Sequence, residues 1–81
     1  AVFFVYPNPT DGKFFVNISK STGKFALRLL NTTGQCVLSI IENHPVIPFK
    51  RELDLNNFPK GIYYLQIISN WYTQTEKIVV Q

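Results

Sequence analysis

The side chains best suited to covalent chemistry in this chain are its only cysteine, Cys36, and its only histidine, His44. A thiolate beside an imidazolium is the reactive pair of cysteine hydrolases. Cys36, however, lies in an alternating strand pattern, whereas His44 lies in a loop beside Pro45. We therefore expect Cys36 to be a buried structural thiol and His44 a solvated loop residue. A single cysteine also excludes an internal disulfide, and the sequence predicts a domain that is not an enzyme.

The carboxylates offer little more chemistry. Glu52 and Asp54 alternate along one strand, which places them about 7 Å apart on the same outward face with no cleft predicted around them. A calcium site needs several oxygens from converging loops, and the only local cluster is Asp11 with Asn8 and Thr10. The competing interpretation is an Asx-type turn, in which these side chains bond the nearby backbone. We expect no metal and no cofactor.

Nucleic acid and nucleotide ligands are not favoured either. The glycines at 12, 23, 34 and 61 are isolated, so none forms a phosphate-binding loop. The formal net charge is +3, but the basic residues are scattered, with Lys50-Arg51 the only adjacent pair. No apolar run reaches the ~18 residues that cross a bilayer, and no secretory signal pattern begins the sequence.

The length suits one small domain spanning residues 1–81. The composition is 46% hydrophobic, and a chain of this size buries only about 60% of its unfolded surface, so its stability is marginal. Methionine is absent, which leads us to expect a piece of a longer polypeptide, with a function defined relative to the missing part.

Short alternating runs bounded by Gly, Pro, Asn or Thr recur along the whole chain, and no 3.6-residue period is sustained. This pattern predicts an all-β chain, a seven-stranded antiparallel sandwich. The strands are expected at Phe3–Tyr6, Lys13–Ser19, Lys24–Asn31, Gln35–Glu42, Phe49–Leu55, Gly61–Ser69 and Thr73–Val80.

Alternation within these runs also predicts which side chains face the core. The expected core positions are Phe14, Val16, Ile18, Phe25, Leu27, Leu29, Leu53, Leu55, Tyr63, Leu65, Ile67, Ile78 and Val80. The opposite faces carry residues that water can cover, such as Lys13, Arg28 and Gln66.

Two kinds of connection between these runs are predicted, hairpin turns and crossings between the sheets. Ser21-Thr22-Gly23 and Asn31-Thr32-Thr33-Gly34 end in glycine, which suits hairpin turns. The longer connections, residues 43–48 and 56–61, are expected to cross between the sheets, with Phe58 covering one end of the sandwich.

Four stretches occur in a characteristic order: "YPNPTDGKFFV", "LRLLNTTGQCV", "LDLNNFPKGIYYLQI" and "EKIVVQ". Together they cover essentially the whole chain, and their combination resembles the type A C-terminal sorting domain of the type IX (Por) secretion system. The residues that carry the resemblance are Pro7, Asn8, Pro9, Gly12, Asn31, Gly34, Gln35, Leu53, Leu55, Gly61, Ile62, Tyr63, Lys77, Ile78, Val79 and Val80.

The resemblance implies an immunoglobulin-like sandwich that acts as a secretion signal for an attached N-terminal cargo. Such domains are recognised by machinery at the outer membrane after transport into the periplasm, and the cargo becomes secreted or surface-bound. Many are then removed by a sortase-like cysteine peptidase, which attaches the cargo to an anionic lipopolysaccharide. Cleavage is expected near Ala1.

Two segments are the expected recognition elements. One is the "PNPTDG" turn, with Pro7, Asn8, Pro9 and Gly12. The other is the terminal strand, Lys77, Ile78, Val79, Val80 and Gln81, whose unpaired edge could add a strand from a partner. The alternative hypothesis is an accessory adhesion or carbohydrate-binding module that uses Trp71 and Tyr72 as exposed aromatics.

Overall fold

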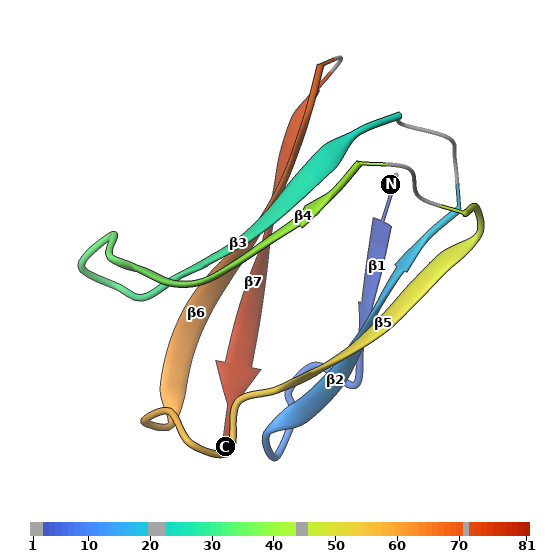
Figure 1. Cartoon of the computed structure of the whole chain (residues 1–81). Coiled ribbons are helices and arrows are strands. Elements are labelled where there is room, and N and C mark those ends of the chain that lie inside the picture. Colours follow the sequence, from blue (N-terminus) through green and yellow to red (C-terminus); the bar gives the residue numbers. More distant parts are fainter. Residues whose placement is uncertain (1–2, 20–22, 44–45, 71) are drawn as a thin grey trace.

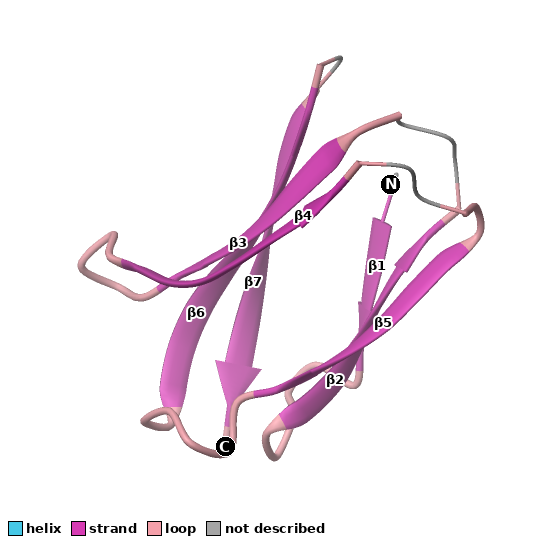
Figure 2. Ribbon diagram, in the orientation of Figure 1, coloured by secondary structure: helices cyan, strands magenta, loops and turns pink. Residues whose placement is uncertain are grey.

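The computed structural model describes residues 3–19, 23–43, 46–70 and 72–81. Seven antiparallel strands form two sheets that face each other (Figures 1 and 2). The strands are β1 Phe3–Tyr6, β2 Lys13–Ile18, β3 Phe25–Leu30, β4 Cys36–Glu42, β5 Phe49–Asp54, β6 Gly61–Ser69 and β7 Thr73–Val80. The all-β sandwich prediction is confirmed, and each strand boundary lies within one residue of the expected one.

The strand order is β1-β2-β5 in the smaller sheet and β4-β3-β6-β7 in the larger one. This is an immunoglobulin-like arrangement in which the fourth strand pairs with the third rather than with the fifth. The connections at 43–48 and 56–61 therefore cross between the sheets as predicted, because β4 and β5 belong to different sheets, as do β5 and β6.

One turn prediction is wrong. The connection that contains Gly23 joins β2 to β3, and these strands lie in different sheets, so it is a crossing and not a hairpin. The length of this connection and its glycine are compatible with a hairpin or with a crossing. The hairpin is excluded because β2 pairs with β1 and β5 and not with β3. The other glycine turn, at Asn31–Gly34, does join the paired strands β3 and β4.

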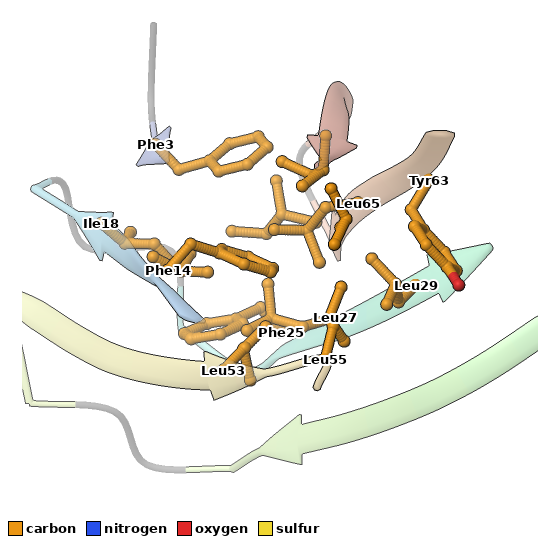
Figure 3. Packing of buried hydrophobic residues seen from close by; sticks show 14 residues of the cluster. Phe3, Phe14, Ile18, Phe25, Leu27, Leu29, Leu53, Leu55, Tyr63 and Leu65 are labelled. Atoms are coloured by element: carbon orange, nitrogen blue, oxygen red, sulfur yellow. The ribbon is translucent and has the colours of Figure 1, made fainter. Parts of the chain in front are cut away.

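The core fills the space between the two sheets (Figure 3). Every expected core position is buried, and Phe3 joins them from β1. Phe25 also packs edge-on against Phe49 across the sandwich, with ring centroids 5.2 Å apart. At roughly 25 cal/mol for each Å² of apolar surface removed from water, this burial is the main stabilising contribution to so small a fold.

Candidate recognition surface

The proline-containing loop between β1 and β2 lies against the last strand of the chain. Asn8 donates from Nδ2 to the backbone oxygen of Lys77 at 2.7 Å, and its Oδ1 accepts from the Val79 N–H at 3.1 Å. A side-chain amide carries the same donor and acceptor as a peptide group. Asn8 therefore bonds the outer edge of β7 much as the backbone of a neighbouring strand would.

Thr10 continues this contact with its backbone. Its N–H donates to the Val79 oxygen at 2.9 Å, and its own carbonyl accepts from the Gln81 N–H at 2.8 Å, which forms a parallel bridge to Val80. The Thr10 side chain is buried, and its Oγ1 donates to the Lys13 oxygen at 2.5 Å. The sequence offered Thr10 as a possible calcium ligand or as a turn residue that bonds the nearby backbone; its Oγ1 does bond the nearby backbone, but no local signal marks its bridge to Val80.

Gly12 holds the other end of the loop against the smaller sheet. Its N–H donates to Thr10 Oγ1 at 3.1 Å, and its carbonyl accepts from the Leu55 N–H at 2.8 Å. The backbone there has φ +141°, which favours glycine, and an added Cβ would collide with the Asn56 side chain. The loop thus fastens the end of β5 and the end of β7 together, and so joins the two sheets.

These bonds correct the expectation of an unpaired terminal edge. The groups that Val79 presents away from β6, its N–H and its carbonyl, are both bonded to the loop, as is the Lys77 carbonyl. A partner strand therefore cannot pair with this part of β7 unless the loop moves. Figure 1 shows the C-terminus at the same end of the sandwich as the connection from β1 to β2.

The expected recognition residues divide into buried and accessible sets. Ile78, Val80 and Gly12 are buried, and Val79 is half-buried. The accessible ones lie together at one end of the sandwich, and we call them the terminal surface: Pro7, Asn8, Pro9, Lys77 and Gln81. The structure thus brings together the two segments that the sequence identified separately.

Asn31, Gly34 and Gln35 build the β3–β4 turn. Asn31 Oδ1 accepts from the N–H groups of Thr33 and Gln35 at 3.1 and 2.9 Å, and the Asn31 carbonyl accepts from the Gly34 N–H at 3.0 Å. Gly34 has φ +86°, in the left-handed region. This motif specifies the hairpin, and the side chains of Asn31 and Gln35 form hydrogen bonds within it.

The later motif residues are structural as well. Leu53 and Leu55 are buried in the core. Tyr63, near the start of β6, donates its hydroxyl hydrogen bond to the Pro59 carbonyl four residues upstream. This is the tyrosine corner of immunoglobulin-like sandwiches, which fixes the connection into the sixth strand. Gly61, the first residue of β6, has φ +139°.

Of the two side chains considered for covalent catalysis, the structure describes Cys36 alone. Cys36 is exposed, which corrects the expectation of a buried thiol, and His44 lies outside the described residues. Cys36 stands opposite Leu30, next to a register shift in the β3–β4 ladder, so the alternation counted along the sequence does not hold there. Among the described residues, no three metal-ligating side chains gather, and Asn8 and Thr10 bond backbone groups instead.

Of the two aromatic residues in the adhesion hypothesis, Tyr72 is less exposed than expected. Trp71 lies outside the described residues, and Tyr72 is half-buried and packs against the core. The Tyr72 hydroxyl is buried and has no hydrogen-bond partner among the described atoms. Burial raises the pKa of Tyr72 above its usual 10.0, because the charged phenolate loses its hydration there.

Residues 4–81 match the family described as "Secretion system C-terminal sorting domain". The chain belongs to this family. The sorting domain is therefore a C-terminal signal for type IX secretion of an attached cargo, which is exported to the cell surface or beyond. Comparison with curated proteins gave no match. In the part of the chain that the structure describes, no helix is long and apolar enough to span a membrane.

Proposed function

We propose that the secretion machinery recognises this sorting domain through the terminal surface, in which the loop and the last strand act as one element. The observation that carries the proposal is the set of bonds from Asn8 and Thr10 to Lys77, Val79 and Gln81. A signal made of two distant segments exists only when the domain is folded. Recognition of this surface therefore reports that the signal has reached its native state.

The chain is, in this proposal, the last domain of a longer exported protein and has no catalytic activity of its own. The cargo precedes residue 1 and reaches the outer membrane through the periplasm. A sortase-like peptidase then cleaves near Ala1. The membership of the family supports this route, and the N-terminal end of β1 lies away from the C-terminus in Figure 1. A protease at the N-terminal side would thus act at a distance from the terminal surface.

The test fuses residues 1–81 behind a Sec-exported reporter in a type IX-competent bacterium. Wild-type reporter should reach the surface, and a translocon-deficient strain should retain it in the periplasm. Retention in both strains would contradict the function. In a strain without the sortase-like peptidase, the exported reporter should keep the mass of the uncleaved fusion, and an unchanged cleaved mass would exclude that peptidase.

Folding and recognition are separated by a matched pair of variants. Lys77→Ala removes an exposed side chain of the terminal surface, whereas Ile67→Val shortens a core residue and should cost about 1 kcal/mol of stability. We expect Lys77→Ala to reduce export while its melting temperature stays near that of wild type. If Ile67→Val reduces export and Lys77→Ala does not, the machinery requires the fold and not this surface.

A further inference from the structure

The charges of the domain are divided unequally between its two sheets. The outer face of the four-stranded sheet, which is the face turned away from the core, includes Arg28 on β3 and Lys77 on β7. Lys24 lines a pocket at one end of this face with Ala26, Ile41 and Ile68. Lys60 lines another pocket at the opposite end, beside Ile62.

All five carboxylates of the chain lie elsewhere. Asp11 belongs to the β1–β2 loop, and Glu52 and Asp54 lie on β5 in the other sheet. Glu42 pairs with Arg51 of the smaller sheet at 3.2 Å, and Glu76 stands opposite the buried Leu65 on the inward side of β7. The outer face of the four-stranded sheet is therefore cationic along its length, with no acidic side chain to balance it.

The same face exposes apolar side chains between its cations. Ile41 is 61% exposed, Ile62 is 38% exposed and Tyr64 is 37% exposed. Ile62 stands opposite Val79, and Tyr64 opposite Lys77. These apolar side chains form two groups at opposite ends of the face, Ile41 at the pocket beside Lys24 and Ile62 at the pocket beside Lys60, and an exposed apolar group with a charged rim is typical of an interaction site.

The two pockets indicate that a partner would present apolar side chains with carboxylates beside them. The pocket beside Lys60 holds about 320 Å³ and is lined by Val37, Phe58, Pro59 and Ile62. The pocket beside Lys24 holds about 190 Å³. Each can receive an apolar side chain, with a lysine at its wall to pair with a neighbouring carboxylate. A lipid or polysaccharide surface offers repeated anionic groups, but not apolar side chains spaced to enter pockets at both ends.

We propose that the outer face of the four-stranded sheet docks an acidic protein surface of the secretion machinery, whose apolar side chains enter the two pockets. This inference rests on the proposed function and adds a second contact area to the terminal surface, with Lys77 shared by both. Opposite charges steer encounter and increase the association rate, which suits a signal that must be released after export. The interaction is accordingly sensitive to salt.

The test uses Lys24→Gln with Arg28→Gln, because both residues lie apart from the terminal surface. The matched control is Lys13→Gln with Lys50→Gln, which removes two cations from the other sheet. Loss of an exposed ion pair lowers binding by about two- to fivefold. We expect the first double variant to lower the rate of reporter export by about threefold or more, Arg28→Glu to lower it further, and the control to leave it unchanged. The melting curve of the first double variant should agree with that of wild type, and the control should melt slightly lower, because Lys50 lies 4.6 Å from the centroid of the Phe15 ring.

A photoreactive residue at Gln66, at the centre of the cationic face, should give an adduct with a machinery component, and Arg28→Glu should abolish it. The same residue at Asn17 on the other sheet should give none. Equal export by the first double variant and wild type would overturn the inference while leaving the proposed function intact. Failure of wild-type export would instead overturn the function. Sedimentation with phosphatidylglycerol vesicles that Arg28→Glu abolishes would replace the protein partner with a membrane.

Discussion

Asn8→Ala is the sharpest test of the connection between the loop and the last strand. The substitution removes the bonds to Lys77 and Val79 at 2.7 and 3.1 Å. A neutral hydrogen bond contributes about 0.5–1.5 kcal/mol net, so the pair contributes roughly 1–3 kcal/mol. Because the site is exposed, water can replace the lost partners, and we expect a loss of about 1–2 kcal/mol. For a domain of this size that corresponds to a melting temperature lower by about 5–15 °C.

Two measurements check the prediction. Urea denaturation gives the change in the free energy of unfolding, and amide hydrogen exchange reports directly on the Val79 N–H, which should lose protection in Asn8→Ala. Asn57→Ala is the control, since Asn57 is exposed in a loop at the same end of the fold and should change stability by less than about 0.5 kcal/mol. Unchanged Val79 exchange, together with a stability equal to that of Asn57→Ala, would refute the reasoning.

Three further substitutions test the fold around this surface. Gly12→Ala should destabilise the domain by about 1–3 kcal/mol in urea denaturation, because Gly12 has φ +141° and an added Cβ would collide with Asn56. The loss should exceed that of Gly34→Ala, whose Cβ would meet open space, and the reverse order would contradict this explanation. Tyr63→Phe should cost about 1 kcal/mol through loss of the bond to Pro59, and an unchanged melting temperature would exclude that role. Tyr72→Phe should instead stabilise by about 1 kcal/mol, because it removes a buried hydroxyl without a partner.

The effect of Tyr72 on the pH dependence of stability follows from the direction in which its pKa is shifted. Its pKa in the folded state is raised above 10.0, so its contribution to stability is complete below pH 10 and is lost as the pH rises through the folded value. Tyr72→Phe has no hydroxyl to titrate, so it does not lose stability in this pH range. The stability difference between the variant and wild type should therefore widen above pH 10, and a constant difference would show that the hydroxyl titrates alike in both states.

The family motifs serve two purposes in this domain. Asn31, Gly34, Gly61 and Tyr63 form turns and the tyrosine corner, so they have a structural role in the sandwich. Pro7, Asn8 and Pro9 are exposed, and Asn8 also bonds β7. The sequence signature of this secretion signal is therefore largely the signature of its fold, and Pro7, Asn8 and Pro9 are among its exposed residues.

The positions of the strands and the composition of the core could be predicted from the sequence, because the alternation of side chains is a local property. Phe14, Leu27 and Leu65 each lie in a run whose period of two places them inward. The motif order also predicted the family and its secretion function. Alternation failed for Cys36, where the β3–β4 ladder shifts its register, and the exposed position of Tyr72 was wrong because burial there depends on packing against the core.

Only the tertiary structure decided what the proline-containing loop contacts. Asn8 is 69 residues from Lys77 and 71 from Val79 along the chain, and no periodicity within either segment encodes a bond over that separation. The assignment of β2 and β3 to different sheets was likewise a property of pairing, as was the gathering of cations on one face. Turn chemistry shows that a chain changes direction, but the partner it meets afterwards depends on how the sheets close around their shared core.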